Sequence, residues 1–161
     1  MERRKKIVLV AAIGLLIPLI FLDSAFAFDK LFILGNQTAL GLAKDFLTML
    51  NNESIPLVIV MDQFEKVKNE KYIIVLGGAK EPGSVDEFTK QVLTAQEQES
   101  GKQPGGKVFV KENVFASGQT IIVFTGPDDA SAADARKNNR KIWWPYLVKW
   151  FDLDTSVPMA Y

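Results

Sequence analysis

The strongest constraint on this chain comes from a short apolar run, Tyr72–Leu76, which Gly77 and Gly78 follow directly. Consecutive aliphatic residues without a polar interruption are typical of a strand buried on both faces, as in a parallel sheet that helices cover on each side. Glycine permits the sharp exit that such a strand needs. The run therefore predicts a central strand of an α/β sheet.

Further segments extend this pattern along the chain. Runs of the same buried character predict three more strands: Lys30–Leu34, Leu57–Met61 and Thr120–Phe124. Helical spacing of apolar residues predicts four helices: Thr38–Asn51, Val85–Ala95, Ala130–Asn139 and Ile142–Phe151. The alternating segment Lys107–Phe115 is predicted to pair with the last strand as a hairpin. We therefore expect the fold class to be α/β, with a small, mostly parallel, Rossmann-like sheet, flanking helices and one antiparallel hairpin.

The remaining connections are less regular. Gln96–Gly106 is rich in Gln, Glu and Gly and contains Pro104, so it is predicted to be a mobile surface loop. Asp62–Lys71 is a polar connection with room for one helical turn. Pro145 lies in the last predicted helix, where it is tolerated if it falls in the first turn.

The N-terminus has the three parts of a secretory signal peptide. A basic segment, Glu2–Lys6, precedes an apolar run, Ile7–Leu22, and small residues at Ser24–Ala27 offer a cleavage site after Ala27. The apolar run contains Pro18 and is shorter than the roughly 20 residues of a spanning helix. An uncleaved signal anchor, with its basic end in the cytoplasm, is the alternative. Both alternatives predict an exported domain.

Three regions follow from this organisation. They are residues 1–27, a signal peptide or anchor; residues 28–152, a single α/β domain; and residues 153–161, an irregular tail.

The composition bears on which functions to expect. The 161 residues include no cysteine and no histidine, which removes thiolate chemistry, cysteine metal sites and the commonest general base. Basic and acidic residues balance at 19 each, which argues against a nucleic-acid-binding protein. We therefore expect a non-catalytic protein with no cofactor. An enzyme that uses only carboxylates and lysines is an alternative, but no substrate class is indicated.

Glycine-containing turns follow several predicted strands, at Gly35–Thr38, Gly77–Gly78 and Gly126–Pro127. Open α/β sheets bind ligands at the carboxyl ends of their strands. Neither the dinucleotide fingerprint nor the P-loop pattern occurs in the sequence. Turns that serve only the backbone explain these glycines equally well.

Carboxylates also stand at the strand ends. Asp62 follows one predicted strand, and Asp128 and Asp129 follow another, so their oxygens are candidate ligands for Ca²⁺ or Mg²⁺. The alternative is that Asp128 or Asp129 caps the next helix and complements its dipole.

Two sequons, Asn36-Gln37-Thr38 and Asn52-Glu53-Ser54, make Asn36 and Asn52 candidate glycosylation sites in an exported chain. Asn52 is the better acceptor because it lies in a predicted loop, whereas Asn36 is expected to take part in a turn.

The densest aromatic segment is Trp143–Phe151. Trp143, Leu147 and Trp150 share one helical face and are expected to close the core against the sheet. Trp144 and Tyr146 point elsewhere, and they are candidates for a surface that contacts protein, glycan or membrane.

Two stretches of this sequence resemble known families. Leu57–Met61, a short link, Tyr72–Gly78 and a helix from Val85 resemble bacterial cell-wall-binding repeats. Gln119–Ala130, followed by Ala133, Ala135 and Asn139, is similar to archaeal S-layer-type surface domains.

The resemblance implies a non-catalytic α/β module in the cell envelope, with a structural or protein-interaction role. Its partners would be other envelope or surface-layer proteins, further copies of this chain included, and the membrane if residues 7–22 are not removed. The alternative is an extracytoplasmic domain that binds a small ligand or metal at the strand carboxyl ends.

Overall fold

The computed structural model describes residues 29–61, 64–77 and 84–155. These residues form a mixed α/β fold around one five-stranded sheet, in the order β2-β1-β3-β5-β4. The strands are β1 (Leu31–Gly35), β2 (Leu57–Val60), β3 (Tyr72–Leu76), β4 (Lys107–Glu112) and β5 (Thr120–Thr125). All neighbouring pairs are parallel except β4 and β5, which form the predicted antiparallel hairpin.

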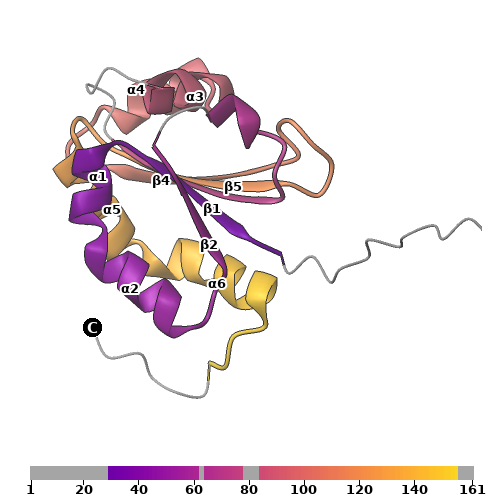
Figure 1. Ribbon diagram of the computed structural model, residues 1–161. Helices are drawn as coiled ribbons and strands as arrows, with labels where there is room; N and C mark the ends of the chain where they lie inside the picture. The colour runs from indigo at the N-terminus through magenta and orange to yellow at the C-terminus, as the bar shows by residue number, and fades with distance from the viewer. Residues whose placement is uncertain (1–28, 62–63, 78–83, 156–161) are drawn as a thin grey trace, which may run out of the picture.

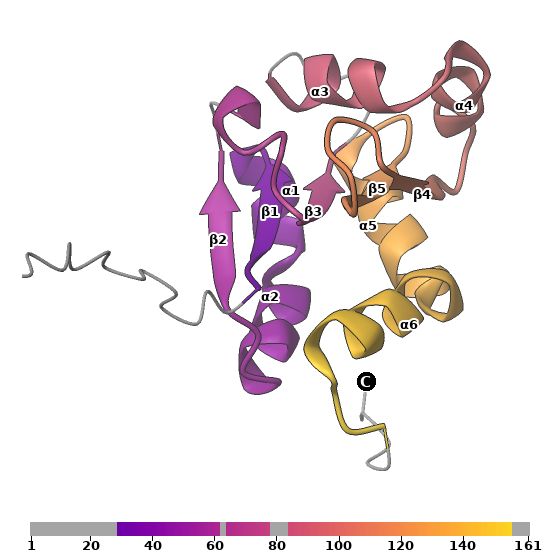
Figure 2. The ribbon, with the colours of Figure 1, turned by 90° about the vertical axis from the view of Figure 1, so that its right-hand side faces the viewer.

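Helices cover both faces of the sheet (Figure 1 and Figure 2). One face carries α1 (Gln37–Leu42), α2 (Lys44–Asn52), α5 (Asp129–Asn138) and α6 (Arg140–Phe151). The other carries the short 3₁₀ turn η1 (Phe64–Lys66), α3 (Ser84–Val92) and α4 (Ala95–Gly101). The expected flanking helices and mostly parallel sheet are therefore confirmed.

Alternate side chains of each central strand enter the two helical layers. From β3, Ile74 packs with Phe46, Trp143 and Leu147 on the α1/α2/α5/α6 face, and Ile73 packs with Phe88 on the α3 face. Both isoleucines are fully buried. Burial on both faces is the reason why this strand is apolar at every position.

Helix α4 is a difference from the sequence-based expectation. Residues 95–101 form a helix where a mobile surface loop over Gln96–Gly106 was predicted, and that prediction is wrong for these residues. Thr94 caps the helix, because its hydroxyl accepts a hydrogen bond from the Glu97 amide while the Glu97 carboxylate accepts one from the Thr94 amide. This capping box satisfies amides that would otherwise lack partners, and it stabilises a helix of low apolar content.

Two further helix boundaries differ. The predicted single helix Thr38–Asn51 is broken at Ala43, whose amide bonds to the Leu40 carbonyl three residues back instead of four. Helix α6 begins at Arg140, before its predicted start, so Pro145 lies beyond the first turn. Pro145 is exposed there, where water can replace the hydrogen bond that proline cannot donate.

Candidate functional site

Three residues that follow parallel strands converge at the carboxyl end of the sheet. Asn36 follows β1, Gly77 follows β3, and Asp129 begins the helix after β5. The Asn36 amide donates to the Asp129 carboxylate over 3.1 Å, and a Cβ placed on Gly77 would lie 3.8 Å from the other Asp129 oxygen. The chain goes from β1 to β2 on one side of β1 and then crosses to β3 on the other side, so the strand order reverses here. Doubly wound sheets bind ligands at such a point.

The described residues leave little room at this point. The hollow between Leu76, Gly77, Phe124 and Asp129 has a volume of about 10 Å³. A single water molecule needs roughly that much space. A ligand larger than a water molecule would therefore have to bind outside this hollow.

The two neighbouring aspartates have different roles. Asp128 is exposed and caps α5, because its carboxylate accepts a hydrogen bond of 2.7 Å from the Ser131 amide. Asp129 is only 4% exposed and faces Asn36. Asp62 lies outside the described residues, among which no group of three acidic side chains is placed to hold a metal. The Ca²⁺ or Mg²⁺ site stays a prediction.

The two sequon asparagines have different surroundings. The side-chain oxygen of Asn36 accepts from the Ala39 amide over 2.7 Å, while its nitrogen donates to Asp129. Asn52 is exposed at the last turn of α2. Both polar atoms of Asn36 are thus engaged within the fold, whereas Asn52 is the more accessible of the two candidate sites, and glycosylation of either stays a prediction.

The aromatic segment contributes mainly to the core. Trp143 and Leu147 are buried, and Trp150 stacks on Tyr72 with ring centroids 4.5 Å apart. Trp144 and Tyr146, the candidates for an interaction surface, are half-buried and pack at the edge of the same core.

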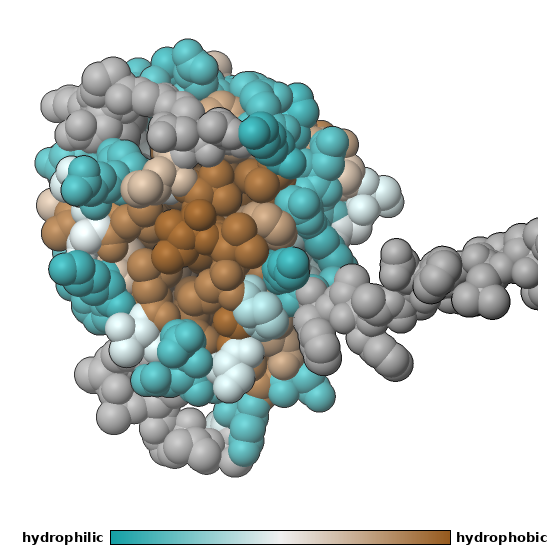
Figure 3. All heavy atoms as spheres, in the orientation of Figure 1, coloured by the Kyte–Doolittle hydropathy of each residue, from teal (hydrophilic) through white to brown (hydrophobic). Residues whose placement is uncertain are grey.

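The largest exposed apolar feature belongs to β2. Its run is uninterrupted and apolar like that of β3, and burial on both faces was expected, but β2 lies at the edge of the sheet. Ile59 is 51% exposed and Met61, directly after the strand, is 56% exposed, more than any other large apolar side chain of the described residues. Figure 3 shows a continuous apolar area on the face where β2 runs in Figure 1.

The edge also presents main-chain groups. The Pro56 carbonyl accepts from the Leu31 amide over 2.9 Å, so Pro56 faces β1. In a parallel ladder, main-chain groups point alternately to either side, so those of Val58 and Val60 also face β1. Those of Leu57 and Ile59 then point away from the sheet. In the part of the chain that the structure describes, no strand pairs with this side of β2.

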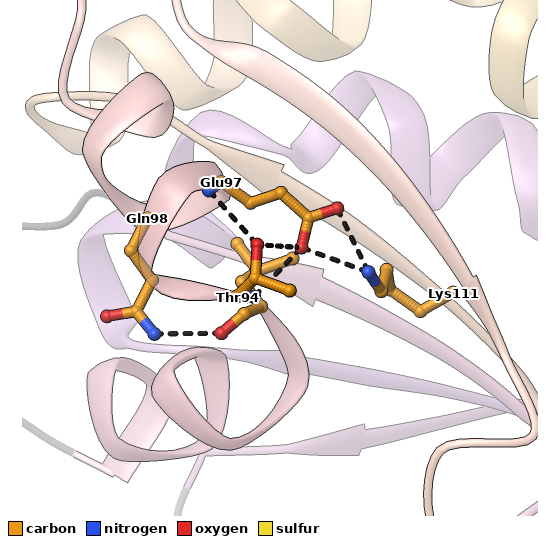
Figure 4. A network of polar contacts seen from close by, with 5 residues as sticks. Thr94, Glu97, Gln98 and Lys111 are labelled. Carbon is orange, nitrogen blue, oxygen red and sulfur yellow. Dashed lines mark hydrogen bonds and ion pairs between the residues drawn. The ribbon is translucent and has the colours of Figure 1, made fainter.

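The opposite edge of the sheet has a different character. Strand β4 carries Lys107, Lys111 and Glu112, and α4 lies close to it. The Lys111 ammonium bonds to both oxygens of Glu97 over 2.9 Å (Figure 4). Burial acts to raise the pKa of Glu97, but hydrogen bonds from Thr94 and Lys111 outweigh it and lower the pKa. Charged side chains on an edge strand discourage pairing with another chain.

Comparison with known proteins does not add to these observations. No family model matches the chain, and no significant match was found among curated proteins or solved structures. Among the described helices, none has the length and apolar character to cross a membrane.

The sequence reasoning missed the edge position of β2. The strand was identified, but its place in the sheet depends on which strand pairs with it, and local composition carries no information about that. Charged residues in Lys107–Glu112 mark β4 as an edge strand, whereas the uncharged run Leu57–Met61 cannot be told from the central strands by its composition.

Proposed function

We propose that this chain is a non-catalytic, exported module of the cell envelope, and that it associates with a second copy of itself along the open edge of β2. The observation that carries the proposal is the unpaired, uncharged edge strand with Ile59 and Met61 exposed beside it. An edge of this kind is a template for strand addition, in which main-chain hydrogen bonds supply affinity and apolar side chains supply burial.

A second copy fits this edge because the edge is complementary to itself. Two β2 strands related by a two-fold axis run antiparallel, so the outward groups of Leu57 and Ile59 in each copy meet those of the other. No charged side chain lies between Leu57 and Met61, so like charges would not oppose each other across the axis.

The difference between the two edges limits the size of the assembly. With Lys107, Lys111 and Glu112 on β4, only β2 is suited to pairing. A single self-complementary edge gives a closed dimer with a continuous sheet, not a filament. The resemblance to surface-layer domains implies a structural role, and this dimer would be the building unit in that role.

Export and attachment are part of the same proposal. The basic, apolar and small-residue segments of residues 1–27 support it, either as a removed signal peptide or as a retained anchor helix. Asp29, which precedes β1, pairs with Lys71 over 2.6 Å.

A second candidate function is the binding of a small ligand at the carboxyl ends of the strands, where Rossmann-like folds bind their ligands. The hydrogen bond between Asn36 and the buried Asp129 at the switch point favours it. The small hollow there, about 10 Å³, makes it the weaker candidate.

Cysteine cross-linking of the full-length chain in cells tests the association. Because the chain has no cysteine, one substituted into β2 is its only thiol. The register of the two paired β2 strands decides which residue faces its own counterpart. Single cysteines are therefore substituted in turn at Val58, Ile59, Val60 and Met61. We expect a disulfide-linked dimer for at least one of them, since paired strands bring Cα atoms within the roughly 4.4–6.8 Å that a disulfide needs.

The matched control is Ile142→Cys, on α6, where the isoleucine is 46% exposed. It should give no dimer, and adding Ile59→Lys to a responsive variant at Val58, Val60 or Met61 should abolish its dimer. No cross-link from any β2 position, or equal cross-linking from Ile142, would refute the proposal.

A further inference from the structure

We infer that a groove between α2, α5 and α6 binds a small aryl carboxylate, an aromatic ring that carries an acidic group. The groove has a volume of about 270 Å³ and lies on the helical layer away from α3 and α4. It is separate from the β2 edge and does not depend on the proposed function.

The floor of the groove is apolar and mostly aromatic. Phe46, Met49 and Trp143 line it and are each at least nine-tenths buried. The rings of Phe46 and Trp143 meet edge to face, with centroids 5.3 Å apart and planes at 81°. Aromatic rings and methionine sulfur favour contact with a further aromatic ring, so the floor suits an aryl group better than a polar one.

The rim of the groove is cationic. Lys137 and Arg140 line it, with Asp45 as the one carboxylate of the lining. Arg136 also belongs to the lining but is only 5% exposed and lies against the Phe46 ring. Lys137 and Asp45 face each other across the mouth at 4.0 Å, and both are more than half exposed. A lining of three cationic side chains and one carboxylate beside an apolar floor is complementary to a ligand with one negative group and one apolar part.

The groove is held open by contacts within the fold. The Arg136 guanidinium donates to the Leu42 carbonyl over 3.1 Å and lies 4.8 Å from the Phe46 ring. The Trp143 indole donates to the Arg136 carbonyl over 2.8 Å, which fixes the corner between α5 and α6. These contacts order the cationic side chain and the floor before any ligand arrives, so binding costs little further conformational entropy.

The size of the groove limits the ligand. A dry cavity of about 150 Å³ holds one benzene molecule. The 270 Å³ here has room for one ring with a short acidic substituent, and is too small for a nucleotide or a lipid. Phenylacetate is therefore a suitable probe of the class.

The test compares three probes that share a ring and differ in the charge of the head group: phenylacetate, 2-phenylethanol and 2-phenylethylamine. Saturation-transfer NMR on the full-length chain in lipid nanodiscs measures their binding without detergent in the groove, and empty nanodiscs give the background. We expect saturable binding of phenylacetate, weaker binding of the alcohol and the weakest binding of the amine.

Charge-removing variants locate the site. Lys137→Gln with Arg140→Gln should weaken phenylacetate binding by about tenfold, since each exposed charge contributes on the order of a few-fold. The same variant should leave 2-phenylethanol binding unchanged, which also shows that the groove remains folded. Arg140→Lys keeps the charge and should retain binding, and Lys141→Gln is the control because Lys141 does not line the groove.

Three results would overturn the inference. They are no saturable binding of phenylacetate, binding of the amine as tight as that of the carboxylate, and equal phenylacetate binding by the double variant and the Lys141→Gln control.

Discussion

The Glu97 carboxylate allows a quantitative prediction, because it both caps α4 and pairs with Lys111 of β4. Glu97 accepts hydrogen bonds from the Thr94 amide at 2.8 Å and from the Lys111 ammonium at 2.9 Å. Glu97→Gln keeps an acceptor for the Thr94 amide and removes the charge that Lys111 faces. The variant therefore isolates the electrostatic part of the link.

The expected loss follows from the exposure of the pair. The side chains of Lys111 and Glu97 are 25% and 27% exposed, so the bond is neither fully buried nor fully screened. A hydrogen bond to a charged group contributes up to about 3 kcal/mol when buried and about 0.5 kcal/mol at the surface, which gives about 1 kcal/mol here. Glu97→Ala also removes the capping box and should lose about 2 kcal/mol in total.

The pH dependence has a definite sign. Because the pKa of Glu97 in the folded protein lies below its ordinary value of 4.5, its stabilisation is complete above that value and is lost as the pH falls through the lowered pKa. The difference in free energy of unfolding between the native chain and Glu97→Gln should therefore shrink on acidification from neutral pH.

Urea unfolding followed by near-ultraviolet circular dichroism measures these differences. Glu99→Gln is the control on the same helix, because Glu99 pairs with Lys102 in a bond where both side chains are more than half exposed. It should change the free energy of unfolding by less than about 0.5 kcal/mol. The reasoning fails if Glu97→Gln costs no more than Glu99→Gln, or if its cost is the same in acid as at neutral pH.

Three other substitutions test separate parts of the structure by the same unfolding measurement. Gly106→Ala should lower the free energy of unfolding by at least about 3 kcal/mol, because φ is +63° and the new Cβ would lie 2.3 Å from the Ser131 carbonyl oxygen. Its control is Gly105→Ala, where φ is +86° but the new Cβ meets no other atom, so the loss should be only about 1 kcal/mol. Asn36→Ala should cost about 2 kcal/mol, since it removes a helix cap and a donor to the buried Asp129, and a loss below about 0.5 kcal/mol would contradict that role. Val58→Pro should lower the free energy of unfolding of the monomer by about 1 kcal/mol or more relative to Ile59→Pro, because only the Val58 amide faces β1. Equal losses would contradict the assigned direction of the edge.

Local sequence patterns were sufficient for most elements of the fold. The runs at Leu31 and Tyr72 are strands buried on both faces, as their uninterrupted apolar residues predicted. The hairpin of β4 and β5 followed from alternation and a glycine turn. Helix α4 was missed because its Gln and Glu residues suggested a loop, although Thr94 and Glu97 have the spacing of a capping box.

The candidate sites were less predictable, since they depend on contacts between distant segments. Asp129 was considered with Asp128 as a metal ligand or a cap, but its partner Asn36 lies 93 positions away. The groove joins α2 to α5 and α6, and Arg136 meets Phe46 only after the helices pack. Nothing in the local sequence around these residues specifies such pairings.

The central claim is that the β2 edge pairs two copies, and its most direct test is the dissociation constant of the dimer. Fully burying an isoleucine contributes about 1.5–3 kcal/mol, so the half of Ile59 that remains exposed contributes about 1 kcal/mol per copy and about 2 kcal/mol per dimer. Sedimentation equilibrium of the full-length chain in density-matched micelles should show a monomer–dimer equilibrium. Ile59→Lys should raise its dissociation constant by about 30-fold or more, whereas Ile142→Lys should leave it unchanged. A native chain that stays monomeric at every concentration, or a dimer that Ile59→Lys does not weaken, would contradict the account.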